Sequence, residues 1–212
     1  MTYVFDQNVL HDVAKESVAS GLNLRGKVNL MRERLDVLYP GQINLKDDWV
    51  FNVAGGAMGQ MTVLHASLVE YLIVFGTPIG TEGFSGRFLA DDYFMILEGE
   101  QWAFNEGDDE KMVFKPGDMH HMPRGEARGY RMPGHCFALE YARGNIPAML
   151  PFGLVDQFTS ILDAKTVAKT LRIYTQAAVG AMLNGRRNMN GNGRSGVLNA
   201  ARGVVKGWLG AG

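Results

Sequence analysis

The chain has 212 residues, 46% of them hydrophobic, which is enough for one well-packed domain with terminal additions. Its 21 Lys and Arg nearly balance 22 Asp and Glu, and this argues against a nucleic-acid partner. Cys136 is the only cysteine, so no internal disulfide can form, which favours a reducing compartment or a cytosol-facing surface over secretion.

Charge is distributed unevenly along the chain. Residues 185–212 carry five basic residues and no acidic one, so the C-terminal end is basic and the remainder is acidic on balance. The most apolar long segment, residues 57–76, contains Gln60, His65 and Glu70, which are costly in hydrocarbon. We therefore expect no transmembrane helix in this chain.

Two amphipathic helices are expected in the N-terminal segment, residues 1–48. Valines at residues 9, 13 and 18 recur at helical spacing and predict a helix that stops at Gly21. A second helix fits residues 28–38, because the following Pro40-Gly41 pair ends a helix.

From Trp49 the sequence changes to short apolar runs separated by glycines, which is typical of β structure. The short runs and tight turns predict a closed barrel or a jelly roll over residues 49–145. The expected strands are residues 49–53, 61–65, 70–75, 93–97, 101–104, 111–115, 128–132 and 136–141.

Two features inside this region need separate interpretation. Residues 60–75 fit either one long buried helix or two strands joined near residues 66–69, and periodicity does not separate these structures. Gly55-Gly56 predicts a tight turn, since the segment lacks both the dinucleotide-binding fingerprint and a phosphate-binding Gly-Lys-Ser/Thr.

Helical spacing returns at Ile146. One helix is expected to run to Leu162, and a second, with Asp163 as its N-cap, to run to Leu183. We expect these helices, within residues 146–184, to close the barrel.

The last segment, residues 185–212, is predicted to be a basic linker followed by a short amphipathic tail. Residues 185–196 are rich in Gly, Asn and Arg, as in a flexible linker. Within residues 197–209, basic residues lie opposite an apolar stripe that includes Trp208, which is typical of a helix in a membrane interface. A helix packed on the barrel, or a frayed tail, fits the same pattern.

Glu140 is the first candidate for chemistry. Phe137, Leu139 and Tyr141 share one face of a predicted strand, while Glu140 shares the other face with small residues. If that face lines a cavity, loss of hydration raises the pKa of Glu140 toward a value useful for proton transfer. If it faces water, Glu140 is an ordinary surface residue, and the spacing by itself favours this simpler interpretation.

Asp91 and Asp92 begin another predicted strand. Adjacent strand residues face opposite sides, so only one of the two aspartates can point into a barrel. A second acid beside Glu140 would let the pair share a proton and divide the acid and base roles.

His120 and His121 lie in a stretch with the turn-and-strand pattern of a cupin barrel, a fold that often binds a metal through histidines. Adjacent residues of a strand face opposite ways, whereas two ligands of one ion need alternate positions. We therefore predict no metal site, and expect a histidine that only makes hydrogen bonds.

Short motifs in order along residues 5–184 resemble the sigma-1 receptor and sterol C-8 isomerase family. Those that resemble the receptor are Val50-Phe51-Asn52-Val53-Ala54-Gly55-Gly56, Met58-Gly59, Leu64-His65-Ala66-Ser67-Leu68, Glu70-Tyr71, Phe75-Gly76-Thr77, Ser85-Gly86-Arg87, Pro116-Gly117, Gly125-Glu126-Ala127, Glu140-Tyr141, Arg143-Gly144 and Ile146-Pro147. Those that resemble the fungal isomerase branch more closely are Ala90-Asp91-Asp92-Tyr93-Phe94, Leu97-Glu98-Gly99-Glu100-Gln101-Trp102 and Pro116-Gly117-Asp118 followed by His120-His121.

This resemblance implies an α+β, mainly β fold: a cupin-like β-barrel with N-terminal helices, closed by amphipathic C-terminal helices that rest on the endoplasmic reticulum membrane. The family is often a homotrimer, and its barrel holds one elongated hydrophobic ligand. We expect the C-terminal helices and the basic tail to attach this chain to the membrane surface, because a sterol must enter from the bilayer.

The implied activity is sterol Δ8–Δ7 isomerisation, as in ergosterol biosynthesis, with a sterol as substrate and no cofactor. Glu140 matches the family's ligand-binding glutamate, whereas the receptor's partner aspartate falls at Phe94, just after Asp91 and Asp92. An acid at Glu140 or Asp92 protonates carbon nine, and carbon seven then loses a proton. The matching substrate-binding positions are Met61, Val63, Tyr71, Ile73, Phe75 and Tyr174.

Two other functions remain open from the sequence. A non-catalytic, receptor-like membrane protein that binds amphipathic amines or sterols would use largely the same residues, and only product formation separates it from the isomerase. A metal-dependent cupin oxygenase would require a bound metal.

Overall fold

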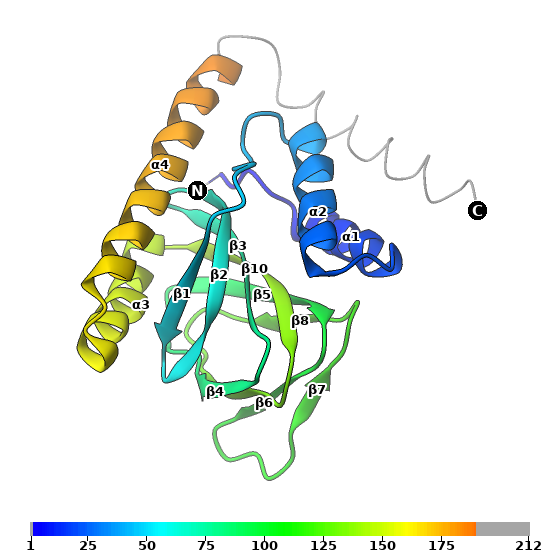
Figure 1. The fold of residues 1–212 in the computed structure, drawn as a ribbon, viewed down its shortest axis with the longest axis vertical. Helices are drawn as coiled ribbons and strands as arrows, with labels where there is room; N and C mark the ends of the chain where they lie inside the picture. Colours follow the sequence, from blue (N-terminus) through cyan, green and yellow to red (C-terminus); the bar gives the residue numbers. More distant parts are fainter. Residues whose placement is uncertain (1, 190–212) are drawn as a thin grey trace.

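The computed structural model describes residues 2–189, in which four helices flank two antiparallel β-sheets (Figure 1). The N-terminal helices are α1 (Gln7–Ala19) and α2 (Leu24–Leu38). The C-terminal helices are α3 (Ile146–Ile161) and α4 (Ala164–Met189). The strands are β1 (Trp49–Ala54), β2 (Ala57–Ala66), β3 (Glu70–Thr77), β4 (Thr81–Phe84), β5 (Ala90–Glu98), β6 (Gln101–Asn105), β7 (Met112–Phe114), β8 (Met119–Met122), β9 (Arg128–Met132) and β10 (Cys136–Gly144).

The sheets have six and four strands, in the orders β1-β2-β3-β10-β5-β8 and β4-β9-β6-β7. This is a cupin-like jelly roll, because the strand pairing forms two sheets and not one continuous closed barrel. Of the two structures open for residues 60–75, the pair of strands is confirmed: Val63 of β2 pairs with Ile73 of β3.

The β1–β2 hairpin turns at Gly55 and Gly56, whose φ angles are 61° and 82°. Positive φ at both central residues is the requirement of a two-residue hairpin turn, so the predicted turn is confirmed. A Cβ on Gly55 would lie 1.9 Å from the carbonyl oxygen of Phe84. This glycine therefore also permits the close approach of β4, where the Phe84 backbone N–H donates to the Gly55 carbonyl at 2.8 Å.

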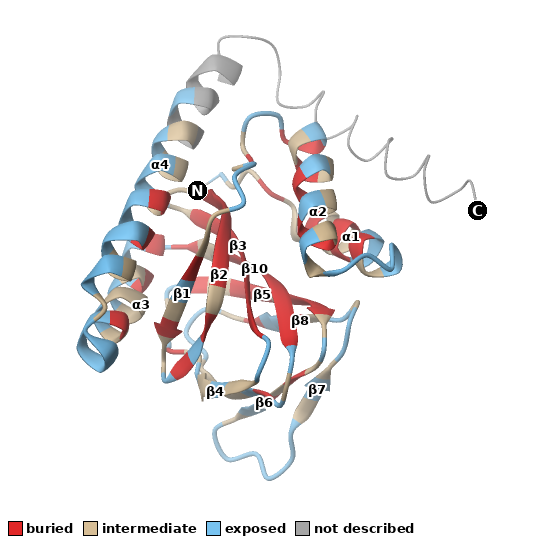
Figure 2. Cartoon of the chain, viewed as in Figure 1, coloured by how far each residue is buried: buried red, intermediate tan, exposed pale blue. Residues whose placement is uncertain are grey.

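The helices divide between two sides of the six-stranded sheet. Helices α1 and α2 bury Leu10, Met31 and Leu35 against the outward-facing side chains of β3, β5 and β10. Helices α3 and α4 lie along β1 and β2, with their outward surfaces exposed (Figure 2). The other face of the six-stranded sheet points to the interior, and α3 and α4 cover this interior where the sheet ends at β1.

Three parts of the predicted secondary structure were wrong. Strand β4 was missed because its short sequence lies among turn-forming residues, and β8 was missed because Met-His-His-Met lacks β-branched residues. Helix α4 runs to Met189, past the predicted end at Leu183, since the glycine at residue 185 costs a helix only about 1 kcal/mol and no proline follows. The predicted amphipathic tail, residues 197–209, lies outside the described residues.

The N-terminal segment is held to the sheet by a buried carboxylate. Glu70, fully buried at the start of β3, accepts the backbone N–H of Val4 at 2.7 Å and the hydroxyl of Tyr141 at 2.9 Å. The backbone N–H of Phe5 donates to the same carboxylate at 3.4 Å. Since an unpaired buried donor is costly, Glu70 ties residues before α1 to β3 and β10.

We expect Glu70→Ala to destabilise the fold by about 2 kcal/mol, because it leaves buried donors without their acceptor. Urea unfolding measures this change. The matched control is Glu16→Ala, whose ion pair with Arg34 is half-exposed and whose loss changes stability by less than about 0.5 kcal/mol. Equal stability of the two variants would contradict the anchoring role of Glu70.

Candidate active site

Strand β10 is central in the six-stranded sheet and carries Glu140. Its two neighbours are β3 and β5, which place Ile73 and Phe94 directly opposite Glu140. Phe137, Leu139 and Tyr141 pack on the helix side, as their shared face predicts. Glu140 projects to the opposite side, where it lines a cavity, so the simpler interpretation as a surface residue was wrong.

The cavity lies between the inner face of the sheets and helices α3 and α4. Its space free of protein atoms measures about 980 Å³, including the open mouth. Among the described residues that line it, Asp92 and Glu140 are the only carboxylic acids, and no Lys, Arg or His is present. The lining consists of Asn52, Ala54, Met61, Tyr71, Ile73, Phe75, Phe84, Ser85, Phe88, Asp92, Phe94, Tyr130, Glu140, Ile146, Met149, Leu150, Phe152, Gly153, Leu154, Gln157, Thr170 and Tyr174.

Strand register brings Asp92 and Glu140 together. Glu140 pairs with Phe94, and Ala142 pairs with Asp92, so the two acids occupy diagonal positions on the same face of β5 and β10. Diagonal neighbours on an antiparallel pair lie about 7 Å apart at Cα, within reach of acidic side chains. The two carboxylates therefore face one cavity from adjacent strands.

The environment of this pair favours protonation. Burial raises the pKa of Glu140 to about 7, although the hydrogen bond donated by the Tyr71 hydroxyl lowers it. Burial and the negative charge of Glu140 raise the pKa of Asp92 well above its usual range, against the backbone N–H of Tyr93. Two like charges in a site without a basic partner are unfavourable, so the surroundings disfavour ionisation of both acids at once.

The hydrogen bonds distinguish the two acids from each other. Tyr71 donates to Oε1 of Glu140, which stabilises the ionised form of Glu140. Asp92 is 4% exposed, and its Oδ1 is buried without a hydrogen-bond partner among the described residues. An orphaned oxygen of this kind is less costly on a neutral carboxyl group than on a carboxylate. These contacts favour the proton on Asp92 and the negative charge on Glu140.

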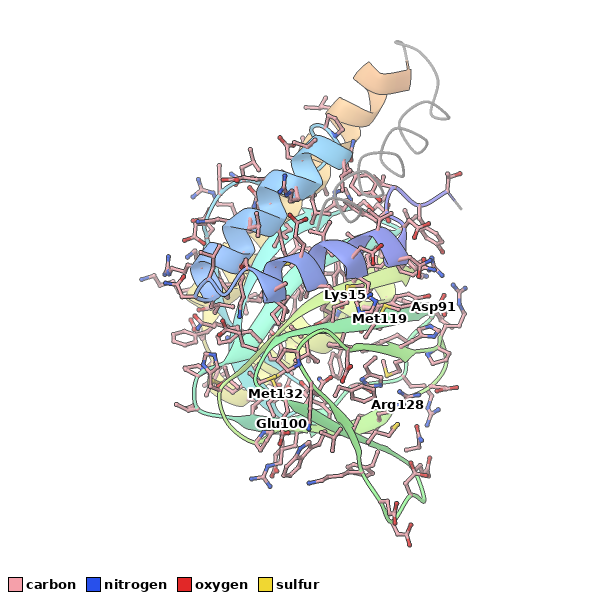
Figure 3. All side chains as sticks on the ribbon, turned by 90° about the vertical axis from the view of Figure 1, so that its right-hand side faces the viewer. Lys15, Asp91, Glu100, Met119, Arg128 and Met132 are labelled. Atoms are coloured by element: carbon pink, nitrogen blue, oxygen red, sulfur yellow. The ribbon has the colours of Figure 1, made fainter. Side chains whose placement is uncertain are left out.

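Asp91 lies outside the cavity. Its carboxylate accepts from the guanidinium of Arg124 at 3.0 Å and lies 3.7 Å from His121, at the outer edge of the molecule (Figure 3). Partial burial alone would raise the pKa of Asp91, but the hydrogen bonds and charge of Arg124 hold it below its usual value. Of the two adjacent aspartates, the structure brings only Asp92 to Glu140.

Most of the predicted substrate-binding positions line the cavity. Met61, Tyr71, Ile73, Phe75 and Tyr174 do so, from β2, β3 and α4. Val63 does not line it but is buried in the same inner apolar cluster, next to a register shift in β2.

Several lining residues were not predicted from the sequence. Tyr130 comes from β9 in the opposite sheet, and burial raises its pKa above the usual range, as do the charges of Glu140 and Asp92. Inside-outside alternation with the buried Met132 was a usable signal for Tyr130. Gln157 and the apolar residues of α3 had no such signal, because nothing local shows which helix face meets the cavity.

His120 and His121 face opposite sides of β8. His120 is buried, stacks on Phe114 at 4.3 Å, and accepts a hydrogen bond from the Arg128 guanidinium at Nε2. Burial lowers the pKa of His120 to about 4, so its ring is neutral. His121 is exposed and stacks on Tyr93. Within residues 2–189, no three His, Cys, Asp or Glu side chains gather in a group that could hold a metal ion.

The fold and the cavity define a cupin-like protein with two carboxylates in one apolar chamber. Residues 1–186 match the family described as ERG2 and Sigma1 receptor like protein, and the chain belongs to that family.

Relatives from both branches of the family match the chain. It is 51% identical over 173 residues to C-8 sterol isomerase erg2 of Aspergillus fumigatus, covering 81% of this chain and 72% of that one. It is 46% identical over 185 residues to C-8 sterol isomerase ERG2 of Gibberella zeae, covering 87% and 79%. It is 38% identical over 178 residues to Sigma non-opioid intracellular receptor 1 of Xenopus tropicalis, covering 83% and 80%. A solved cupin superfamily protein from Desulfitobacterium hafniense aligns with a TM-score of 0.36 and 17% identity, over 46% of this chain and 79% of that one.

The raised pKa of Glu140 predicts that the stability of the ligand-free chain falls as pH rises. The pKa of Glu140, about 7 when folded, exceeds its ordinary value of 4.5, so the unfolded chain loses this proton first. We expect Glu140 to account for a loss of roughly 2.5 kcal/mol in unfolding free energy between about pH 5 and about pH 8, and Glu140→Gln to remove this loss. Urea unfolding from about pH 5 to about pH 8 measures it.

The control is Glu16→Gln, at a half-exposed position, which should keep the pH dependence of the wild type. Parallel stability curves for the wild type and Glu140→Gln would contradict the raised pKa.

Proposed function

We propose that this chain is a sterol Δ8–Δ7 isomerase of ergosterol-type biosynthesis. The observation that carries the proposal is the pair Asp92 and Glu140 in one apolar cavity, in a chain whose fungal relatives are named C-8 sterol isomerase. The reaction moves a carbon-carbon double bond within ring B, so it requires one proton delivered, one removed, and a cation stabilised between the two events.

In the first step, Asp92 acts as the acid. Its carboxyl group transfers a proton to carbon nine of the Δ8 sterol, and the electron pair of the double bond forms the new C–H bond. A tertiary carbocation remains at carbon eight. The raised pKa of Asp92 supports this role, because a carboxylic acid must keep its proton near neutral pH to donate it.

In the second step, Glu140 acts as the base. Its carboxylate removes a proton from carbon seven, and the electrons of that C–H bond form the Δ7 double bond. The proton then passes from Glu140 back to Asp92, which restores the pair. The Tyr71 hydroxyl supports this role because it holds Glu140 ionised and oriented.

Aromatic side chains complete the environment for the cation. Tyr71, Phe75 and Tyr174 line the same cavity as the carboxylates, and their rings attract a positive charge. The ionised Glu140 stabilises the developing cation in a mainly apolar cavity. The same arrangement binds amphipathic amines, whose ammonium group resembles the cation.

The second candidate is a non-catalytic receptor for amines or sterols. The 38% identity to a sigma non-opioid receptor supports it, but the relatives named C-8 sterol isomerase match at 42% to 51%. Amine binding does not separate the two functions, since both use the same acids. Formation of a Δ7 product does.

We expect Glu140→Gln and Asp92→Asn each to keep the fold and to lower turnover of a Δ8 sterol at least about a hundredfold, since each removes a proton-transfer group. Gas chromatography of the sterols formed by purified protein measures the product. The matched control is Asp91→Asn, on the opposite face of β5, which should stay within about threefold of the wild type. Unchanged turnover in Glu140→Gln would remove Glu140 from the mechanism.

We further propose that helices α3 and α4 rest on the endoplasmic reticulum membrane, because an insoluble sterol must enter from a bilayer. No helix within residues 2–189 has the length and apolar character needed to cross a membrane. The two helices and the residue that caps α3 nevertheless expose apolar side chains, a feature of membrane-binding surfaces: Val155, Phe158, Ile161, Leu162, Leu171, Val179 and Leu183. The homotrimer that the family resemblance implies stays a prediction.

We expect the wild type to float with phosphatidylcholine vesicles in a density gradient, and Phe158→Asp/Ile161→Asp to remain in the dense fraction. These residues are half-exposed on α3, and a carboxylate at either position opposes insertion. The control, Leu22→Asp/Val37→Asp, changes exposed apolar residues of the N-terminal helical segment and should still float. Flotation of both double variants would contradict this membrane surface.

A further inference from the structure

Helix α3 covers the free edge of β1 through polar contacts. The Val53 backbone N–H donates to Oε1 of Gln157 at 2.6 Å, and the Gly56 backbone N–H donates to Asp156 at 3.2 Å. Strand β1 is the edge of its sheet, so its outward backbone groups have no strand partner. The Gln157 amide carbonyl therefore replaces a missing strand at Val53.

This contact fixes the orientation of the Gln157 amide. A backbone N–H only donates, so the amide atom that faces Val53 must be the carbonyl oxygen. The NH₂ group must then point away from β1. Gln157 is 3% exposed and lines the same cavity as Glu140 and Asp92.

The NH₂ group of Gln157 lacks an acceptor among the residues that the structure describes. Its Nε2 is buried, and no hydrogen-bond partner is within range. A buried donor without an acceptor costs about 1–3 kcal/mol, and most such groups in folded proteins are paired. An orphaned donor in the wall of a ligand cavity points to an acceptor that arrives with the ligand.

We propose that Gln157 is a positioning residue that donates a hydrogen bond to the hydroxyl oxygen of the sterol. This inference rests on the proposed function. The ring-A hydroxyl is the one acceptor of a simple Δ8 sterol, whose remaining surface is hydrocarbon. A donor at a fixed point of an otherwise apolar cavity selects one orientation for such a ligand.

The hydrogen bond sets ring A against α3 and the β1 edge, and leaves ring B, which holds the double bond, for the carboxylates. Its contribution is to orientation and selectivity and not to proton transfer. A site that hydrogen-bonds a hydroxyl discriminates against the analogue that lacks it, because the buried donor is then left unpaired.

The test compares two enzymes with two substrates. The substrates are a Δ8 sterol and the same Δ8 hydrocarbon without the ring-A hydroxyl, and the enzymes are the wild type and Gln157→Met, which has similar volume and no donor. We expect the wild type to favour the hydroxylated substrate by about tenfold or more in kcat/KM. In Gln157→Met this preference should fall to about twofold or less, because kcat/KM decreases for the hydroxylated substrate more than for the substrate without the hydroxyl.

The ratio of the two kcat/KM values separates positioning from structural damage. Loss of the Val53 contact lowers turnover of both substrates together and leaves their ratio unchanged. Gln157→Leu provides a second variant without a donor if Gln157→Met does not fold. Asp156→Ala is the matched control, because it removes the neighbouring α3 contact to Gly56 from a residue that does not line the cavity.

Loss of the hydroxyl preference in the Gln157 variants, with the preference intact in Asp156→Ala, supports the inference. A preference that persists in the Gln157 variants, or is absent in the wild type, overturns it and leaves the isomerase proposal standing. If the wild type forms no Δ7 product from either substrate, that result contradicts the proposed function, and the inference about Gln157 fails with it.

Discussion

Two carboxylic acids share one cavity without a basic side chain among its described lining residues, and the proposed chemistry depends on this constraint. Ionising both Asp92 and Glu140 in this apolar cavity is unfavourable, which raises the pKa of each. The Tyr71 hydroxyl makes the two acids different, because it donates a hydrogen bond to Glu140. In the proposed mechanism, one acid thereby keeps a proton while the other accepts one. The proposed acid and base roles thus come from position and hydrogen bonding and not from residue type.

The fold supplies the surroundings that this pair requires. Strand β10 lies between β3 and β5, and its large residues pack outward against α1 and α2 while Glu140 faces inward. Small residues flank Glu140 on the inner face, since Cys136, Ala138 and Ala142 leave room for a ligand. Helices α3 and α4 close the open edge and contribute Tyr174 and Gln157 to the cavity wall.

The same closure has a second consequence for how a ligand is held. The part of the cavity wall that α3 contributes contains the orphaned amide of Gln157, which is held against β1. The polar groups of the cavity thus come from separate elements: the sheet contributes the two carboxylic acids, and helix α3 contributes the neutral amide donor. An otherwise apolar chamber can then orient a rigid ligand with a single hydroxyl.

The sequence determined the local and alternating features. Period-two spacing assigned Phe137, Leu139 and Tyr141 to one face and Glu140 to the other, and paired glycines located the β1–β2 turn. The same alternation showed that only one of Asp91 and Asp92 could enter the barrel, but not which one. Those features depend on neighbours within a few residues, so they can be predicted from a single chain.

Only the tertiary structure decided which face was inside and which distant groups meet. Asp92 meets Glu140 through the register of β5 and β10, and Asp91 turns outward to Arg124. Gln157 reaches the cavity because α3 packs on the β1 edge, a contact between residues far apart in sequence. Strand register and helix docking follow from the packing of the whole core, and no local pattern encodes them.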